Sequence, residues 1–356
     1  MERTTDVLAD DYLPSASMSL LKLRSSLMAA ARQFFLQAGY WEVTTPILSS
    51  EMVLDSWSDP FITTDAVTER PLFLQTSPEA HMKRLLAAGS GPIFQFSRGF
   101  RKGDFGPRHN PEFTLLEWYF PEGELTDQIQ FVENFIRLFF SEATRLRIQT
   151  APRTHDFSRP VSSGRLLPST AFERLTYSAA FERFLGLAAL DVPVAELIAK
   201  ARQLQLDLPG LDEDDRDGWL NDLLVNAIEP RLGFDRPVVL MDYPASQAGL
   251  ATTRPLYPAG PEVANRFELY IDGVELCNGY HELTDPVELA HRAQTHARLR
   301  EKAGLPPINP PQRLMSAMAA NFPSATGVSL GFDRLVMLAL GTSTIADVMS
   351  FAWDRA

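Results

Sequence analysis

The chain has 356 residues, of which 45% are hydrophobic and 22% are charged, and this length suits one large domain or two small ones. A net charge of −12 excludes a broad, nonspecific nucleic-acid surface, which needs a basic footprint, but it permits a local basic site and favours a basic protein partner. The single cysteine excludes an internal disulfide, and no apolar run approaches the ~20 residues of a membrane span. The acidic N-terminus also lacks a signal-peptide pattern. Together these features predict a cytoplasmic protein.

The first elements expected along the chain are a flexible arm and a helix–strand unit. Residues 1–19 are polar and irregular, which predicts a poorly ordered N-terminal arm. Between Leu20 and Gln37 apolar residues recur at helical spacing, and Gly39 ends this helix. Residues 40–46 then form a short strand that ends at a proline.

A strand-to-helix turn follows at Thr76-Ser77-Pro78-Glu79. Residues 72–75 form a short strand before it, and the helix after it reaches Leu86 or Ala87. A hydroxyl N-cap, a proline in the first turn and a glutamate three residues after Thr76 are sufficient to explain the turn as a helix start. The functional alternative is that Ser77 and Glu79 contact a substrate beside the next hairpin.

The stretch from Ser97 to Phe120 contains an arginine-bearing strand end, a loop rich in glycine and charge at 102–110, and a second strand from Glu112. Alternation gives this second strand a mostly apolar face, which is fit to pack on helices, and a face that combines aromatic rings with a carboxylate. The apolar face holds Thr114, Leu116, Trp118 and Phe120, and the other holds Phe113, Leu115, Glu117 and Tyr119. A core face does not normally hold an ionised glutamate without a partner, so the second face suits a cationic ligand. The simpler alternative is an ordinary antiparallel hairpin with a long loop.

The middle of the chain is expected to be mainly helical. Five acids in the seven residues 211–217 predict a solvated helix start. The remaining elements predicted here are helices at 125–143, 175–187, 194–205 and 219–228, an exposed loop or insertion at 151–170, and a short buried strand at 238–241.

A β-hairpin with two acidic residues follows. Asp272-Gly273 between two apolar-rich strands is a strong signal for a two-residue turn, in which Tyr270 faces Glu275. Glu268 is then diagonal to Glu275 on one face, about 7–8 Å away between backbones. Two carboxylates on one face repel unless a cation lies between them, and Mg²⁺ held by them and by substrate phosphates fits. The alternative is a solvated face with two unrelated acids. Residues 278–282 continue the strand and bring another carboxylate nearby.

The last motif connects a strand to a helix after a polar helix at 286–302 and a short one at 314–318. Gly331 marks the turn, and Arg334 lies in the first turn of the helix that continues over 335–340. The macrodipole disfavours a cation there, but a nearby anion such as a nucleotide phosphate would reverse the sign. The alternative is a surface arginine paired with Asp333 or another acid.

These segments resemble, in order, the three motifs of class II aminoacyl-tRNA synthetases. Residues 20–46 resemble motif 1, which builds a dimer interface; Phe96 to Tyr119, with His109-Asn110-Pro111-Glu112-Phe113, resembles motif 2; and Gly331-Phe332-Asp333-Arg334 resembles motif 3. The resemblance implies an α+β class II synthetase catalytic fold over residues 20–356, with an antiparallel sheet flanked by helices and an insertion at 151–170. It also implies a homodimer.

Within the class, the chain is most similar to the lysine branch, through the Thr-Ser-Pro-Glu turn and the later acidic residues. A lysyl-tRNA synthetase also carries an N-terminal anticodon-binding barrel, and motif 1 near residue 20 leaves no room for one, so tRNA is not an expected partner. The sequence resembles the stand-alone elongation factor P (R)-β-lysine ligases along nearly its whole length. At Ser329 the synthetases tend to have glycine, and a larger residue there would reshape the amino-acid pocket and disfavour α-lysine.

The resemblance implies that ATP activates (R)-β-lysine as an acyl-adenylate, which a lysine side chain of elongation factor P then attacks. Arg101 would hold the α-phosphate and Arg334 the outer phosphates, and these two are the expected catalytic residues. Phe113 would stack on adenine, and Glu268 and Glu275 would hold Mg²⁺. The expected ATP contacts are Arg101, Lys102, Gly103, Asp104, His109, Asn110, Phe113, Glu275, Leu276, Gly331 and Arg334. The expected amino-acid contacts are Ser77, Pro78, Glu79, Glu117, Tyr119, Asn278, Glu282 and Ser329.

One position departs from the family pattern. The synthetases usually have a glutamate two residues after the motif 2 arginine, where it reads the adenine amino group, and this chain has Gly103 there with Asp104 next. Asp104 or backbone atoms would take over that contact. Two other functions stay open from the residues: activation of α-lysine or another amino acid with a tRNA or small-molecule acceptor, and a non-catalytic dimeric binding or regulatory module. The net charge opposes tRNA charging, and the intact arginines and acids oppose the non-catalytic alternative.

Overall fold

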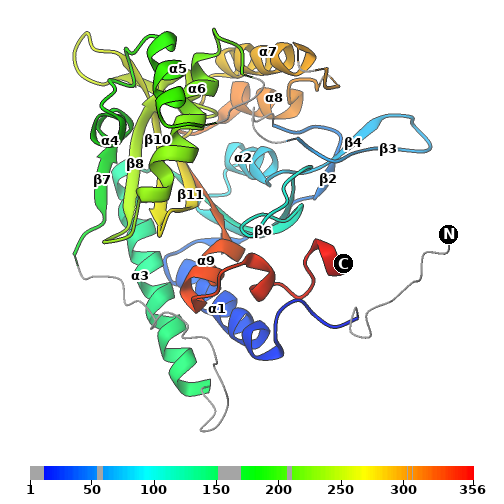
Figure 1. Ribbon diagram of the computed structural model, residues 1–356. Helices are drawn as coiled ribbons and strands as arrows, with labels where there is room; N and C mark the ends of the chain where they lie inside the picture. Colours follow the sequence, from blue (N-terminus) through cyan, green and yellow to red (C-terminus); the bar gives the residue numbers. More distant parts are fainter. Residues whose placement is uncertain (1–11, 54–58, 151–169, 207–210, 303, 307) are drawn as a thin grey trace, which may run out of the picture.

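The structure is a computed structural model, and it describes residues 12–53, 59–150, 170–206, 211–302, 304–306 and 308–356 (Figure 1). The helices are α1 (Met18–Gln37), α2 (Glu79–Ala87), α3 (Leu125–Thr150), α4 (Tyr177–Leu185), α5 (Val194–Gln203), α6 (Arg216–Leu223), α7 (Pro286–Lys302), α8 (Gln312–Asn321) and α9 (Phe332–Leu340). The strands are β1 (Trp41–Glu42), β2 (Leu48–Ser49), β3 (Ile62–Thr64), β4 (Pro71–Leu74), β5 (Ile93–Phe100), β6 (Glu112–Pro121), β7 (Glu173–Thr176), β8 (Val238–Pro244), β9 (Thr253–Pro255), β10 (Glu262–Ile271), β11 (Val274–His281) and β12 (Ala325–Gly331).

Most of the described strands join one sheet, in the order β1-β5-β6-β12-β11-β10-β8-β7, with β9 paired to β10. The strands from β5 to β8 in this order are antiparallel, and the two edge pairs β1–β5 and β7–β8 are parallel. A small separate sheet has the order β2-β4-β3. The predicted α+β fold with helices flanking a sheet is confirmed, but the sheet is mixed rather than purely antiparallel.

The back face of the sheet carries the larger core. Helices α1, α3 and α9 pack against it and against one another, as Figure 1 shows below the sheet. Their apolar stripes meet the back-facing side chains of the central strands, for example Phe35 and Phe135 against Trp118 of β6. Each such large apolar side chain stabilises the fold by about 1.5–3 kcal/mol on burial. Because Leu116, Trp118 and Val328 point to this core, their strand neighbours Glu117 and Ser329 point to the front.

In the described part of the chain, helices cover the front face toward its two ends. Helices α4, α5 and α6 pack over β7, β8 and β10 and share a second core with Leu240 and Tyr270. At the other end α2 packs on β5 and β6, next to α7 and α8 (Figure 1). Between these two groups the front face of β6, β12 and β11 presents polar side chains, and there the candidate site is located.

Several predicted boundaries are corrected by the structure. The expected helix at 175–187 begins as strand β7 and turns helical at Tyr177, because Thr176 is the N-cap and accepts a hydrogen bond from the Ala179 amide. The expected helix at 219–228 is α6 followed by a π-helical turn at Leu224–Ile228. The strand expected at 40–46 is limited to Trp41–Glu42, and α3 extends beyond 143.

Other predicted segments agree with the structure or lie outside it. The acidic residues at 211–217 precede and begin α6, with Asp215 as its N-cap. Most of the expected arm at 1–19 and of the loop at 151–170 lies outside the described residues. No helix in the described ranges is both long and apolar enough to span a membrane.

Candidate active site

The strand register aligns predicted site residues from four strands in one row across the front face. Glu117 of β6 pairs with Ser329 of β12, Ser329 pairs with Asn278 of β11, and Asn278 pairs with Glu268 of β10. Neighbouring strands are about 4.8 Å apart, so the row spans roughly 14 Å. The next row on the same face holds Tyr119, Gly327, Tyr280 and Arg266. Residues separated by more than 200 positions in the sequence therefore face one common space.

A β-bulge at Leu276 brings Glu275 to this face. Tyr270 pairs with Glu275 as predicted, but Leu269 pairs with Cys277, so Leu276 has no partner in the ladder. Leu276 and Cys277 both enter the back core, and Glu275 and Asn278 both point to the front. The predicted pairing of Tyr270 with Glu275 is confirmed, and beyond the bulge Glu268 lies opposite Asn278. The side chain of Leu276, an expected ATP contact, is turned away into the core.

Glu117 is a buried carboxylate at one end of the row. Its side chain is almost fully buried, Tyr119 donates a hydrogen bond to Oε1 at 2.7 Å, and no partner for Oε2 is found among the described residues. Burial, followed by the negative charge of Glu79, raises the pKa of Glu117 to about 8, although the hydrogen bond from Tyr119 and the nearby Ser329 hydroxyl act in the opposite direction. The open oxygen of a buried glutamate can receive a cationic group.

Lys83 of α2 completes this cluster, and the sequence analysis missed it. Its ammonium lies 2.6 Å from Glu79 Oε1 and 2.5 Å from Glu282 Oε2, and its side chain is 2% exposed. Burial acts to lower the pKa of Lys83, but the charges of Glu282 and Glu79 outweigh it and raise that pKa. The i,i+4 spacing from Glu79 was a signal in the sequence, but it is shared by ordinary surface pairs on helices.

The turn before α2 holds its residues differently from the prediction. Pro78 is the N-cap of α2, and the hydroxyl of Ser77, not that of Thr76, accepts the hydrogen bond from the Glu79 amide. Asn278, opposite Ser329, donates from Nδ2 to the hydroxyl of Tyr280, and within the described residues its buried Oδ1 has no partner. The structure thus brings Glu79, Glu117, Glu282 and Asn278 to one side of the front face.

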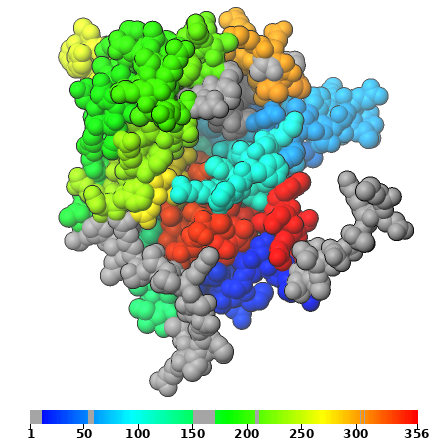
Figure 2. Space-filling model, in the orientation of Figure 1, coloured from blue at the N-terminus to red at the C-terminus, as the bar shows by residue number. Residues whose placement is uncertain are grey.

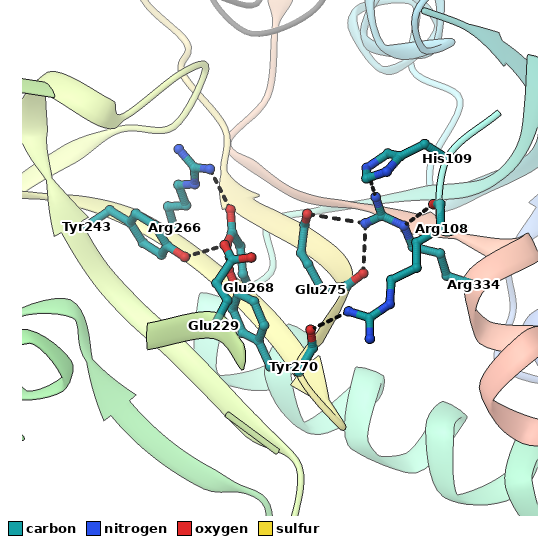
Figure 3. A network of polar contacts seen from close by, with 10 residues as sticks. Arg108, His109, Glu229, Tyr243, Arg266, Glu268, Tyr270, Glu275 and Arg334 are labelled. Atoms are coloured by element: carbon teal, nitrogen blue, oxygen red, sulfur yellow. Dashed lines mark hydrogen bonds and ion pairs between the residues drawn. The ribbon is translucent and has the colours of Figure 1, made fainter. Parts of the chain in front are cut away.

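The second part of the site is centred on Arg334, in the first turn of α9 (Figure 3). Its guanidinium donates to the carbonyl oxygens of Arg108 and Glu275, contacts Glu275 Oε2 at 3.4 Å, and lies 2.7 Å from His109 Nε2. A guanidinium has no acceptor, so His109 accepts through Nε2 as a neutral imidazole. Burial and then the charge of Arg334 lower the pKa of His109, in agreement with this assignment. Arg334 does not pair with Asp333, which is bound elsewhere.

Arg101 lies at the end of β5, beside Phe113. Its guanidinium is 5.1 Å from the centre of the Phe113 ring, and its buried Nε has no hydrogen-bond partner among the described residues. The positive charges of Arg334 and Arg101 both act to lower the pKa of Glu275, so both face the same carboxylate. Two guanidinium groups with free donor capacity are suited to hold phosphates or a carboxylate.

The loop between β5 and β6 is fastened to the C-terminal segment. Asn110 donates to the Glu112 carbonyl and accepts from the Trp353 amide at 2.9 Å, and the ring of Phe105 contacts that of Trp353. In the space-filling view the C-terminal residues lie directly beside this hairpin (Figure 2). The side chain of Asn110 thus positions the loop. Lys102 is exposed and 3.7 Å from Asp59, and Gly103 has a φ of +87°, which glycine adopts readily.

The acidic residues of β10 and β11 offer oxygen ligands of the kind that Mg²⁺ prefers. Glu268 receives hydrogen bonds from Tyr243, Tyr270 and Arg266, whereas Glu275 is partly buried beside Arg334 (Figure 3). Burial, followed by the charge of Glu268, raises the pKa of Glu275. Within the described ranges no group of three or more His, Cys, Asp or Glu side chains is arranged to hold a metal ion by itself. Glu275 therefore fits a metal that is also held by phosphates, and Glu268 fits it after giving up one of its present partners.

Comparisons with known proteins identify the family of this chain. Residues 10–355 match the family model described as tRNA synthetases class II (D, K and N). A protein of Pasteurella multocida named elongation factor P–(R)-β-lysine ligase is 38% identical over 98% of this chain and 99% of its own length. A protein with the same name from Histophilus somni is 39% identical over 98% of this chain and 99% of its own length. Another from Haemophilus influenzae is 38% identical over 97% of this chain and 98% of its own length. The chain therefore belongs to the class II tRNA synthetase family that includes the aspartate, lysine and asparagine enzymes.

Proposed function

We propose that this chain is an ATP-dependent ligase that activates (R)-β-lysine as an acyl-adenylate and transfers it to a lysine side chain of elongation factor P. The observation that carries the proposal is a set of buried polar atoms that lack hydrogen-bond partners in the described part of the chain. Glu117 and Asn278 each have such an acceptor oxygen, and Arg101 has such a donor nitrogen. A substrate with ammonium groups at one end and a carboxylate near phosphates at the other satisfies all three.

The reaction follows from the charges of these residues. Glu117, Tyr119, Glu79 and Glu282 hold the ammonium groups, and Asn278 contacts the amino acid from the middle of the row. Arg101 draws the substrate carboxylate and the α-phosphate of ATP together, so that a carboxylate oxygen attacks phosphorus and pyrophosphate leaves. The ε-amino nitrogen of the acceptor lysine then attacks the acyl carbon, and AMP leaves. Such catalysis consists mainly of positioning and charge stabilisation.

The nucleotide contacts belong to the same proposal. Arg334, kept in place by His109 and the Glu275 backbone, binds the outer phosphates, while Phe113 presents an aromatic face to the adenine. The loop residues Lys102, Gly103, Asp104 and Asn110, together with Gly331 at the start of α9, line the nucleotide. Glu275 and Glu268 would hold Mg²⁺, which neutralises phosphate charge when it is bound.

The preference for β-lysine over α-lysine is attributed to Ser329. Its strand partners are Glu117 and Asn278, and its hydroxyl acts on the Glu117 carboxylate. A glycine at this position would open space between these two contacts. Replacing Ser329 with glycine should therefore increase the use of α-lysine relative to (R)-β-lysine.

The acceptor, the assembly and the location extend the proposal. The relatives' shared name supports elongation factor P as the acceptor, and the net charge of −12 opposes binding of tRNA. A homodimer through α1 and the segment after it is supported by Leu36, Trp41, Ile47 and Leu48, which are apolar and 42–50% exposed. We also propose a cytoplasmic location.

The proposal is tested by ATP–pyrophosphate exchange with (R)-β-lysine and α-lysine in parallel, followed by mass spectrometry of elongation factor P. Preferential exchange with (R)-β-lysine and a mass increase of one β-lysyl group on the factor are expected. Exchange with α-lysine alone would overturn the substrate, and the absence of a mass shift would overturn the acceptor. Light scattering or analytical ultracentrifugation tests the dimer.

A further inference from the structure

Lys83 is an ammonium group that the protein itself supplies to the amino-acid site. A lysine is almost never fully buried unless it is paired, and Lys83 is paired with both Glu79 and Glu282. Glu79 lies one turn earlier on α2, but Glu282 follows β11, so the ammonium links two distant parts of the chain. The proposed reaction does not use this group.

The surroundings of Lys83 form a closed set of charges. In the part of the chain that the structure describes, the titratable groups around it are Glu79 of its own helix, Glu117 and Tyr119 of β6, and Glu282. The charge of Glu79 raises the pKa of Glu117, and that of Lys83 lowers it, so the four charged residues interact as one cluster. The Lys83 ammonium contacts two of the three carboxylates, those of Glu79 and Glu282, and acts on the third, Glu117, through its charge. Lys83, Glu117 and Glu282 have little or no exposure.

This imbalance defines a capacity for cations. Buried charge without compensation is costly, so the cluster, once its three carboxylates are ionised, takes up two further positive charges most favourably. A diamino acid brings two ammonium groups, while its carboxylate is left to Arg101. An amino acid with one ammonium group would leave a buried carboxylate uncompensated. Without Lys83 the cluster would instead take up three positive charges.

We propose that Lys83 is a specificity-determining positioning residue, whose fixed ammonium sets the capacity of the amino-acid site at two substrate ammonium groups. This inference rests on the proposed function, because it concerns the same amino-acid site. Lys83 acts through Glu79 and Glu282 and does not itself contact the reacting atoms. A purely structural role, in which the ion pairs only fasten α2 to the end of β11, is the competing explanation.

The two explanations differ in the outcome of charge-balanced replacements. Lys83→Met and Glu79→Gln each change the net charge of the cluster, whereas the double variant Lys83→Met/Glu79→Gln restores it. We expect each single variant to raise the KM for (R)-β-lysine at least about tenfold at pH 8, and the double variant to be less impaired than either. The KM for ATP should change by no more than about twofold. A structural role predicts a double variant as poor as the worse single one.

The pH profile gives a second readout. In Lys83→Met a proton can replace the missing positive charge, so its KM for the amino acid should approach that of the wild type at pH 6.5 and diverge from it toward pH 8.5. Lys83→Arg keeps the charge and should show the wild-type pH trend. Thermal denaturation of every variant identifies those that fail to fold, and the double variant and Lys83→Arg keep the test valid if Lys83→Met fails.

The wild-type chain separates this inference from the proposed function. Exchange with either α-lysine or (R)-β-lysine, but not with norleucine, supports a capacity of two ammonium groups even if the β-lysine assignment is wrong. Equal exchange with norleucine would overturn the inference directly. A double variant no better than the single variants, or a penalty of Lys83→Met that does not depend on pH, would overturn it while leaving the proposed function intact.

Discussion

Arg24 of α1 and Asp333 of α9 form a buried ion pair across 309 positions of the chain. The second oxygen of Asp333 accepts a hydrogen bond from the amide of Thr114 in β6 at 2.6 Å, and Arg24 also contacts the Thr114 hydroxyl. Segments that the sequence resemblance assigns to motifs 1, 2 and 3 are thus held together by one carboxylate. Asp333 is the neighbour of Arg334, so the same contact fixes the start of α9 against the sheet.

The first prediction concerns this ion pair. Asp333→Ala leaves Arg24 without its partner and the Thr114 amide without its acceptor, and we expect a loss of about 3–5 kcal/mol in the free energy of unfolding. Arg24→Met/Asp333→Asn removes both charges but keeps an amide oxygen for Thr114, so it should recover part of this loss. Urea denaturation measures both. Glu42→Gln, at the exposed pair with Arg32, is the control and should cost no more than about 1 kcal/mol. An equal loss in the control and in Asp333→Ala would contradict the assignment.

The second prediction is a pH dependence of amino-acid binding. The pKa of Glu117 is raised to about 8, so Glu117 is mainly protonated and neutral at pH 7 and ionised above pH 8. Because an ammonium group binds better to the ionised carboxylate, the KM for the amino acid should fall as the pH rises from 6.5 to 8.5, by up to about tenfold per unit at the lower end. The variant Glu117→Gln should have a high KM throughout this range and a weaker trend, because burial raises the pKa of Glu282 to about 7 and this carboxyl still titrates. A wild-type KM that is independent of pH would rule out titration of Glu117.

The third prediction concerns Gly327, between Tyr119 and Tyr280 in the second row. A Cβ at this position would lie 2.2 Å from Glu282 Oε1 and 2.4 Å from Tyr119 Cε1, so Gly327→Ala must displace one of these side chains. We expect the KM for the amino acid to rise strongly while the KM for ATP is little changed. Gly279→Ala is the matched variant on the back face, where the Cβ would meet the ring of Phe267, and it should lower stability by about 1–3 kcal/mol instead. Unchanged amino-acid kinetics in Gly327→Ala would show that the site tolerates this shift.

The fourth prediction concerns His109 and Arg334. The pKa of His109 is lowered, so its imidazole is neutral at pH 7 and accepts from Arg334. As the pH falls through this lowered pKa, His109 becomes cationic, loses the acceptor and repels Arg334, so the KM for ATP should rise between pH 7 and pH 5. His109→Asn keeps an acceptor that does not titrate, and its KM for ATP should be less sensitive to acid. The same acid sensitivity in both proteins would assign the effect to another group.

The sequence by itself determined the fold class and the strand face on which the expected residues of β6 lie. Helical spacing in residues 20–37, alternation in β6 and the Asp272-Gly273 turn depend on local periodicity and turn geometry, which neighbouring residues fix. Alternation alone predicted Glu117 and Tyr119 on the face opposite Trp118, and the structure agrees.

The tertiary structure decided which of these residues meet. Regular pairing after the Asp272-Gly273 turn would have placed Glu275 and Asn278 on opposite faces, and the bulge at Leu276 puts both on the front. A bulge leaves one residue unpaired in the strand ladder, and here it allows two successive side chains, Leu276 and Cys277, to pack into the back core. The helices that complete this core lie far from β11 in the sequence. Glu282 as a partner of Lys83, and the partners of Asp333, were hidden for the same reason: a buried charge is stabilised by groups that only folding brings within a few ångströms of it.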